Sequence, residues 1–245
     1  MSFRRRTPKA EARVLGVTLA RGGSQGITGK NIRPLGGRPL IEYTIAEALK
    51  SELISRYVVS TDSPQIQSVS IGAGAEAPFL RPPELSTDEA TSVSALQHAV
   101  NFVEKEEGKK YDYVVEVMAT NPFKSAGDID RCITALIDSG ADSVVAVHRV
   151  QDNHPARIKR IEDGFLRDFC VPEVLESRRQ DLIPHAYVRS GSIYALARDE
   201  LMVQGRRYGS SNSLPYILEA DRVINLDSEI DWLVAEAMMK LERGS

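Results

Sequence analysis

The chain has 245 residues, of which 42% are hydrophobic and 27% are charged, a composition typical of a globular protein built on one large domain. A formal net charge of −3 argues against a general nucleic-acid binder, and no apolar run approaches the ~20 residues of a membrane span. The two cysteines, Cys132 and Cys170, have no metal-binding spacing, so we expect reduced thiols and a cytoplasmic location.

The first 13 residues are basic, but no apolar stretch follows Arg4-Arg5-Arg6, which argues against a secretory signal. We expect a disordered basic tail over residues 1–13 and one domain over residues 14–245. An apolar run at residues 15–19 then predicts a buried strand at the start of this domain.

A glycine-rich loop follows this strand over residues 20–31. Glycine lets backbone N–H groups approach a ligand closely, and Arg21 and Lys30 supply positive charge for a polyanion. The loop lacks the G-K-[ST] of a P-loop and the G-x-G-x-x-G of a dinucleotide site. We therefore predict a phosphate-binding loop, with an ordinary glycine-rich turn as the alternative.

Strands and helices alternate along the rest of the chain. The predicted strands cover residues 57–61, 113–118, 143–147, 191–197 and 223–226. The predicted helices cover residues 39–50, a segment starting at Ser63-Pro64, 89–107 after a polar turn capped by Ser86 or Thr87, 128–138, and 229–241 with Trp232 in the core. This alternation predicts an α/β fold with a mainly parallel sheet, helices on both faces and a ligand cleft beyond the carboxyl ends of the strands.

A hairpin interrupts the pattern between residues 154 and 186. Two short segments of mixed apolar and charged residues, at residues 158–161 and 165–169, flank Asp163-Gly164, which is a strong signal for a tight β-turn. The residues leave two alternatives open: an edge hairpin that caps its own domain, or an arm that reaches a second subunit.

Residues 20–41 read A-R-G-G-S-x-G-I-x-x-K-N-I-x-x-L-x-G-x-P-L-I. This string resembles the signature that opens the acylneuraminate cytidylyltransferases, the CMP-sialic acid synthetases and their relatives that act on other nine-carbon keto sugar acids. The resemblance implies a Rossmann-like, three-layer nucleotidyltransferase fold of the GT-A type. It also implies Mg²⁺ as cofactor and a homodimer in which residues 154–186 form an arm that contributes to dimerisation and to the sugar site.

The same resemblance assigns nucleotide-binding residues. Arg81-Pro82-Pro83-Glu84-Leu85 with the following Ser92 is similar to the family's R-P-x-E-L…D-x-x-x-S element, which holds the cytosine base. Gln25 stands where relatives usually have lysine, so one charge that faces the triphosphate is missing. Arg21 and Lys30 are the expected catalytic residues, and the expected nucleotide-binding set is Arg21, Ser24, Gln25, Lys30, Asn31, Arg81, Ala90 and Ser92.

Two further elements are assigned to the sugar acid. Residues 118–124 stand in the place of the family's Q-P-T-S-P-L-R, with Met118 at the glutamine that contacts the sugar in relatives. Residues 178–194 resemble R-Q-x-L-P…N-G-A-I-Y, with Ser190 in place of the asparagine; by this match Arg179 pairs with the sugar carboxylate. The expected sugar-binding residues are Met118, Thr120, Arg157, Arg179, Gln180 and Tyr194.

The last element is Asn225-Leu226-Asp227-Ser228-Glu229, which resembles D-I-D-[ST]-E, whose two aspartates hold Mg²⁺ in relatives. Here Asp227 keeps the carboxylate, and Asn225 offers an amide oxygen but no charge. A helix N-cap is the alternative role of Asp227. Mg²⁺ can be held by one carboxylate, phosphate oxygens and water.

Together these matches predict a cytidylyltransferase. The anomeric hydroxyl of a 2-keto-3-deoxy nine-carbon sugar acid attacks the α-phosphate of CTP, and pyrophosphate leaves. The departures at Met118 and Ser190 favour a diamino sugar acid of the legionaminic or pseudaminic type over sialic acid. The alternatives are a homologue that uses another nucleotide or sugar, and a nucleotide-binding regulator without turnover; the residues identify no general base.

Overall fold

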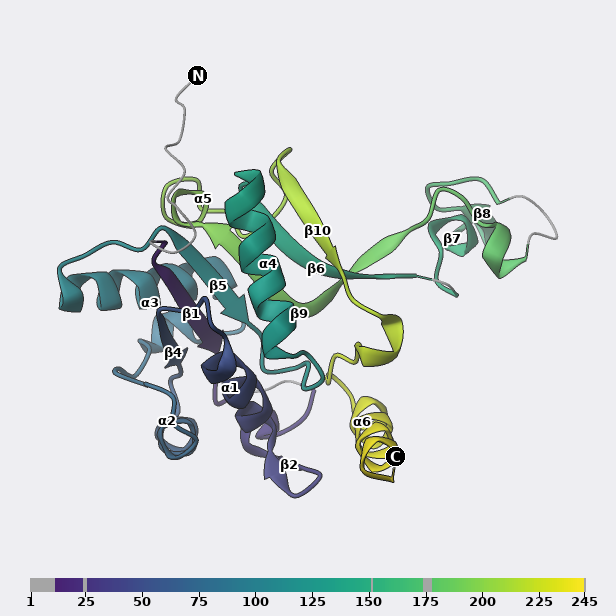
Figure 1. Cartoon of the computed structure of the whole chain (residues 1–245). Helices are drawn as coiled ribbons and strands as arrows, with labels where there is room; N and C mark the ends of the chain where they lie inside the picture. Colours follow the sequence, from purple (N-terminus) through teal and green to yellow (C-terminus); the bar gives the residue numbers. More distant parts are fainter. Residues whose placement is uncertain (1–11, 24–25, 151, 174–177, 245) are drawn as a thin grey trace.

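The computed structural model describes residues 12–23, 26–150, 152–173 and 178–244 (Figure 1). Its central sheet has six strands in the order β10-β6-β9-β5-β1-β4. Their bounds are β1 Val14–Leu19, β4 Arg56–Ser60, β5 Tyr113–Val117, β6 Ser143–Arg149, β9 Tyr187–Ala197 and β10 Ser213–Ile217. Strand β9 pairs antiparallel with β5 and β6, and the other pairs are parallel. The predicted mainly parallel α/β fold is confirmed.

Helices cover both faces of the sheet and form three layers with it (Figure 1). On one face, helices α1 (Leu40–Lys50), α2 (Pro64–Gly72) and α4 (Ala126–Ser139) bury their apolar sides in one core cluster. On the other face, α3 (Ser92–Glu107) and α5 (Arg198–Met202) pack against a second cluster with Leu15, Val17 and Val114 of the sheet. The alternation of side chains along β1 and β5 explains this division, because successive residues point to opposite faces.

Local sequence signals set the helix ends. Ser125 accepts a hydrogen bond from the backbone N–H of Asp128, whose carboxylate bonds back to the Ser125 N–H, so α4 begins with a complete capping box. The helix ends at Gly140, which adopts a φ of 68° that suits glycine. Ser63 caps α2 with Pro64 as its first residue, as the sequence predicts.

A third core cluster joins the glycine-rich loop to the last helix, α6 (Glu229–Gly244). Two short strands, β2 (Pro34–Leu35) and β3 (Arg38–Pro39), follow the loop. Ile27 and Leu35 pack with Leu226, Trp232 and other apolar residues of this cluster. Trp232 is 2% exposed, which confirms its predicted place in the core.

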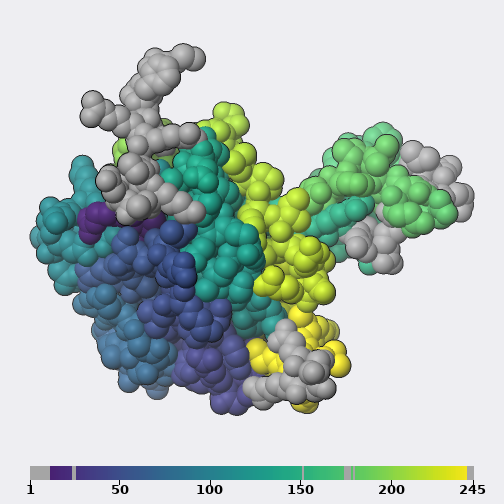
Figure 2. All heavy atoms as spheres, viewed as in Figure 1, coloured from purple at the N-terminus to yellow at the C-terminus, as the bar shows by residue number. Residues whose placement is uncertain are grey.

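The predicted hairpin forms from β7 (Lys159–Glu162) and β8 (Phe165–Asp168). Asp163 and Gly164 both have positive φ, 53° and 80°, as a two-residue turn between twisted strands requires. The extended ends of β6 and β9 carry the hairpin, and Figure 2 shows it standing clear of the domain. We call residues 154–186 the arm. The arm also holds two single 3₁₀ turns, η3 (Pro155–Arg157) and η4 (Arg179–Asp181).

Two element predictions are wrong. Residues 223–226 form no strand: a 3₁₀ turn, η5 (Ala220–Arg222), leads into an extended segment whose Leu226 N–H donates to the Thr120 carbonyl at 3.0 Å. The edge strand beside β6 is instead β10, which the sequence did not predict because Pro215 interrupts a short, half-polar run.

The second wrong prediction is the start of the third long helix. Helix α3 begins at Ser92 rather than at residue 89, and Thr91 is its N-cap, not Ser86 or Thr87. A 3₁₀ turn, η2 (Pro83–Leu85), and a further turn at Thr87 occupy the intervening residues.

At the N-terminus, residues 1–11 of the predicted tail lie outside the described residues. Arg13 bonds to Asp112 and Glu107 of the domain.

Candidate active site

A cavity of about 300 Å³ lies at the carboxyl ends of β1 and β5, beside the start of α3. This is where ligands bind in open α/β sheets. It brings together three motifs that are far apart in the sequence: the glycine-rich loop, the Arg81–Ser92 region and the segment after β5. Seven predicted site residues line it: Arg21, Asn31, Arg81, Ala90, Ser92, Met118 and Thr120.

The glycine-rich loop is braced against its neighbours. Asn31, 6% exposed, donates from Nδ2 to the Arg21 carbonyl at 3.0 Å. The backbone N–H of Gly22 donates to Asp62 Oδ1 at 2.9 Å. The Arg21 guanidinium lies 2.5 Å from Asp88 Oδ1, so an anion entering here would compete with Asp88 for it. The predicted nucleotide ligands Ser24 and Gln25 lie outside the described residues.

The far end of the loop lies against the segment after β10. A Cβ atom on Gly26 would stand 2.2 Å from the backbone oxygen of Asp227, so this close approach needs glycine. Four residues on, Lys30 places its Nζ 2.9 Å from Asp227 Oδ1. The predicted phosphate-binding lysine and the predicted metal-binding carboxylate are therefore direct neighbours.

Arg81 forms the inner wall of the cavity. It is 5% exposed, donates from Nε to Ser86 Oγ at 3.0 Å and lies 3.9 Å from Asp62. Burial lowers the pKa of Arg81, and the nearby charge of Arg21 adds to this, while Asp62 opposes it. Close by, the Ala90 N–H is directed to the Thr87 carbonyl at 3.3 Å, so Ala90 supplies wall and carbonyl rather than a free donor.

The segment after β5 holds an unused polar group. Thr120 lines the cavity, and its Oγ1 is buried and, within the described residues, has no hydrogen-bond partner. Buried polar atoms are normally paired, so an orphan on a cavity wall indicates a ligand. Met118 also lines the cavity near Thr120, and its side chain has no hydrogen-bond donor.

Lys124 holds this segment from the opposite side. Its Nζ donates to Thr44 Oγ1 and to the Met118 carbonyl, both at 2.7 Å, and to the Asn121 carbonyl at 2.5 Å. Burial lowers the pKa of Lys124 to about 7, although the negative charges of Glu47 and Asp128 work against this. Lys124 therefore fixes the backbone that carries Met118 and Thr120.

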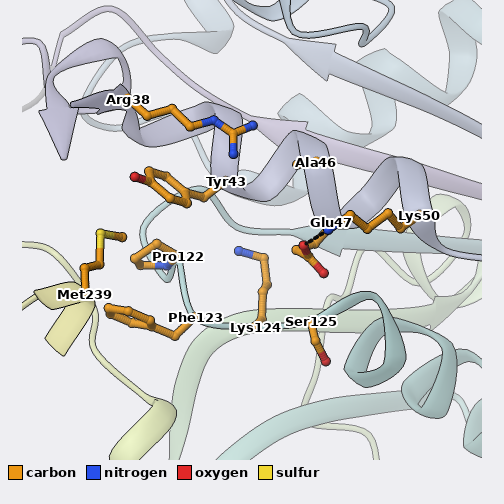
Figure 3. A pocket seen from close by; sticks show the side chains of 10 residues that line it. All are labelled: Arg38, Tyr43, Ala46, Glu47, Lys50, Pro122, Phe123, Lys124, Ser125 and Met239. Atoms are coloured by element: carbon orange, nitrogen blue, oxygen red, sulfur yellow. Dashed lines mark hydrogen bonds and ion pairs between the residues drawn. The ribbon is translucent and has the colours of Figure 1, made fainter. Parts of the chain in front are cut away.

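Figure 3 shows a second cavity, of about 340 Å³, behind this segment, with Lys124 pointing from its floor toward α1. Its other cations are already paired. Lys50 lies 2.6 Å from Glu47, and Arg38 lies 2.9 Å from Glu42. The first cavity, with its orphaned hydroxyl, is therefore the better candidate for a substrate site.

Tyr194 is predicted from the sequence to bind the sugar, but it does not line the first cavity. It is 3% exposed and lies under the guanidinium of Arg207, which is 4.2 Å from its ring centroid; burial raises its pKa. Arg207 in turn donates to Glu116, which is 2% exposed and does line the cavity. Sequence reasoning missed both residues, although a glutamate within the apolar run of β5 was a readable signal.

The remaining predicted sugar-binding residues belong to the arm, which stands clear of the domain (Figure 2), and none of those whose side chains are described lines the cavity of the same chain. Arg157 ends η3, with its Nε 3.9 Å from Glu173. Gln180 lies exposed in η4, and the side chain of Arg179 is outside the part of the structure that is described. One chain therefore does not bring these residues to Met118 and Thr120.

The predicted metal residues lie together but are not equivalent. Asp227 is exposed and accepts hydrogen bonds from Lys30 on Oδ1 and from the Asn225 amide nitrogen on Oδ2. Over the described ranges, no group of three or more His, Cys, Asp and Glu side chains could hold a metal ion. One exposed carboxylate beside a phosphate-binding loop nevertheless fits Mg²⁺, which takes part of its coordination from substrate phosphates. Asn225 directs its amide nitrogen to Asp227. It is therefore better placed to orient the Asp227 carboxylate by a hydrogen bond than to bind Mg²⁺ itself.

Comparison with known proteins accounts for this arrangement. A family profile described as cytidylyltransferase matches residues 15–211. A CMP-N,N'-diacetyllegionaminic acid synthase of Legionella pneumophila is 31% identical over 94% of this chain and 98% of its own. N-acylneuraminate cytidylyltransferase A of Danio rerio is 32% identical over 89% of this chain and 49% of its own.

A solved structure has the same fold. CMP:2-keto-3-deoxy-manno-octonic acid synthetase, in complex with CTP, superposes with a TM-score of 0.71 at 17% identity, covering 94% of this chain and 100% of that one. No helix in the described part of the chain is long and apolar enough to cross a membrane. On the match of the family profile and the near full-length relatives, the protein belongs to the cytidylyltransferase family of nucleotidyltransferases.

Proposed function

We propose that the protein joins CMP to a nine-carbon 2-keto-3-deoxy sugar acid. The anomeric hydroxyl of the sugar attacks the α-phosphorus of CTP, a P–O bond forms to the sugar oxygen, and the bond to the leaving pyrophosphate breaks. The convergence of the glycine-rich loop, Arg81 and the Met118–Thr120 segment on one cavity is the observation that carries this proposal.

The nucleotide occupies the side of the cavity between the glycine-rich loop and the start of α3. Arg81 and Ser92 hold the nucleoside, with Asn31 fixing the loop beside it. Arg21 and Lys30 stabilise the charge on the phosphates. Because nucleotidyl transfer depends mainly on positioning and charge neutralisation, two preplaced cations in this loop supply what the chemistry needs.

Asp227 is the residue that holds Mg²⁺ in this proposal, together with phosphate oxygens of CTP. When bound, the ion neutralises phosphate charge and supports departure of pyrophosphate. Asn225 orients the Asp227 carboxylate, and Lys30 lies beside it at 2.9 Å. The residues on the cavity wall do not identify a dedicated base for the sugar hydroxyl.

The sugar site is completed by a second copy of the chain. Four large apolar residues of the arm, Ile161, Phe165, Leu166 and Phe169, are each between 60 and 79% exposed. An apolar patch of this kind marks an interaction surface. The hairpin does not cap its own domain, so we assign it to a homodimer in which each arm carries Arg157, Arg179 and Gln180 toward the partner's cavity.

The sugar is of the diamino class, legionaminic or pseudaminic, rather than sialic acid. Met118 cannot make the amide contact that the family's glutamine makes, so the sugar contacts differ from those of a sialic acid enzyme. The Legionella pneumophila relative, which is matched over nearly its whole length, is named for a diacetyl sugar acid of this class.

Pyrophosphate release with Mg²⁺ tests the proposal directly. The experiment crosses CTP, GTP, UTP and ATP with sialic, legionaminic and pseudaminic acids. We expect release with CTP and a diamino sugar acid, and little with the other nucleotides. Tight CTP binding without release on any sugar would instead support a nucleotide-binding regulator.

A further inference from the structure

Glu116 is a charged residue at the centre of the sheet. It lies in β5, whose other residues are Tyr and Val, and it is 2% exposed. Val114 on the same strand belongs to the core cluster on the α3 face, so Glu116, two residues on, points to that face as well. There it lines the cavity described above together with Met118 and Thr120.

Glu116 and Met118 are two residues apart and therefore project from the same face of the sheet. Backbone hydrogen bonding continues past β5, because the Met118 N–H donates to the Ser192 carbonyl at 2.8 Å. The two side chains are thus neighbours, roughly 7 Å apart along the strand direction. The Glu116 carboxylate is therefore a hydrogen-bond acceptor beside Met118, the position at which this chain lacks the amide of its relatives.

Arg207 fixes the orientation of the Glu116 carboxylate. Its Nη1 donates to Glu116 Oε2 at 2.6 Å, and its guanidinium lies over the ring of Tyr194. Tyr194 is the direct cross-strand partner of Glu116 on β9. The hydrogen bond from Arg207 occupies one of the acceptor sites of the Glu116 carboxylate, which has about four.

The pair is not needed as a core element. A buried ion pair contributes little net stability relative to well-packed apolar residues, which is what the neighbouring positions of β5 contain. The free-energy cost of burying this ion pair has an explanation if the Glu116 carboxylate binds a ligand at the cavity wall. Burial raises the pKa of Glu116, and Arg207 opposes this by stabilising the ionised form.

We propose that Glu116 is a specificity-determining residue that accepts a hydrogen bond from a hydroxyl or amide N–H group of the sugar acid, with Arg207 as its positioning residue. The inference rests on the proposed function. The hydrogen bond to Glu116 replaces the contact that an amide at position 118 would make. It favours sugar acids that present a hydrogen-bond donor to Glu116.

The charge of Glu116 also decides which substrate it meets. A carboxylate repels the triphosphate of CTP and the carboxylate of the sugar acid, so both must lie elsewhere in the site. In the proposed function the nucleoside lies against Arg81, Ala90 and Ser92, which line the cavity near the start of α3. The uncharged part of the sugar is the group that remains for Glu116.

The test measures KM for the sugar acid and for CTP in separate titrations with the full-length protein. Glu116→Leu alone would remove the carboxylate partner of Arg207, whose side chain is only 14% exposed, so the main variant combines Glu116→Leu with Arg207→Met. Glu116→Gln retains an acceptor of nearly the same shape. The matched control is Glu200→Leu with Arg206→Met, which removes another pair with a buried glutamate, 2.6 Å apart and outside the cavity.

We expect the Glu116/Arg207 double variant to raise KM for the sugar acid by roughly 10- to 100-fold, the effect of losing a hydrogen bond to a charged group. Its KM for CTP stays within twofold, Glu116→Gln recovers part of the loss, and the control pair has no such effect. Adding Met118→Gln to the double variant restores activity on sialic acid relative to the diamino sugar acids.

Two results would overturn the inference. One is an unchanged KM for the sugar acid in the folded double variant. The other is a parallel rise in KM for CTP, which would place Glu116 in the nucleotide site. Failure of the proposed function is separate from both: it would show as no pyrophosphate release by the wild-type protein on any sugar acid.

Discussion

Gly26 sets how closely the glycine-rich loop approaches the segment that carries Asp227. The backbone oxygen of Asp227 occupies the space where a side chain at position 26 would begin. Lys30, four residues later, then reaches the Asp227 carboxylate. The absence of a side chain at position 26 thus brings together Lys30 and the Asp227 carboxylate, which are 197 residues apart in the sequence.

Gly26→Ala should therefore separate the loop from Asp227. The added Cβ would stand 2.2 Å from a backbone atom, and backbone cannot move aside as a flexible side chain can. We expect turnover to fall roughly 100-fold, the effect of misplacing catalytic groups by about 1 Å. Steady-state kinetics with CTP and the sugar acid measure this.

The control for this substitution is Gly72→Ala, at the end of α2, where a Cβ would meet nothing within 4 Å. It should leave turnover unchanged. If Gly26→Ala were as active as this control, the close approach of the two segments would have no role in catalysis.

At the scale of elements, the segment after β5 is held between α1 and the cavity by one lysine. Lys124 is 3% exposed and bonds to Thr44 of α1 and to two carbonyls of the segment. A buried ammonium without a direct carboxylate partner is costly, which is why its pKa falls to about 7. The position of Met118 and Thr120 thus depends on a group that titrates near neutral pH.

This lysine should make stability depend on pH. An unfolded lysine has a pKa of 10.5, so between pH 7 and 10.5 the unfolded chain binds more protons than the folded one. Stability therefore rises with pH in this window, by no more than about 1.4 kcal/mol per pH unit from this group. Urea denaturation between pH 7.5 and 9.5 measures the free energy of unfolding.

Lys124→Met should lose this slope relative to wild type, and Lys124→Arg should lose it too, because arginine stays charged throughout the range. Other groups titrate alike in all three proteins. Equal slopes in wild type and both variants would show that Lys124 keeps its ordinary pKa in the folded protein.

The elements themselves were readable from the sequence where local signals agreed with the fold. The Asp163-Gly164 turn and the Ser63-Pro64 helix start both fix backbone angles locally, and both predictions are confirmed. Residues 223–226 misled because an apolar run can be buried without joining a sheet; here Leu226 packs on Trp232. Ladder pairing is a tertiary property, so a short run gives no warning of this.

The candidate site was partly readable for the same reason. Motif residues such as Arg81 and Asn31 carry their chemistry in their local pattern, and the structure places them on one cavity. Arg207 has no such pattern, since its role depends on reaching Glu116 from 91 residues away. Sequence alone also placed Tyr194 on the cavity wall, whereas Arg207 covers it.

At the scale of the whole molecule, the arm is the feature that one chain does not explain. It projects from the domain on the extended ends of β6 and β9 (Figure 2), and Ile161, Phe165, Leu166 and Phe169 of the arm are exposed. The predicted sugar-binding residues of the arm also lie away from the cavity of their own chain. The homodimer proposed above would account for both observations.

Charged substitutions on the hairpin should dissociate such a dimer. We expect Ile161→Asp with Phe165→Asp to give a monomer by analytical ultracentrifugation, because each would bury a charge in an apolar interface. Turnover should fall by at least about tenfold if the arm supplies the partner's sugar contacts. The control is Val203→Asp, at a position 68% exposed on the domain.

A double variant that remains dimeric would place the interface elsewhere. A double variant that is monomeric and fully active would remove the arm from the sugar site. The second result would leave the cavity on the domain as the whole active site.

In the proposed reaction, the α-phosphate of CTP is transferred to the sugar acid. The most direct measurement uses CTP labelled with radioactive phosphorus at the α- or the γ-position, with Mg²⁺ and a diamino nonulosonic acid. We expect the α-label in the sugar nucleotide and the γ-label in pyrophosphate. Recovery of the α-label as free CMP or as unchanged CTP, from folded protein that binds CTP, would contradict the proposed reaction.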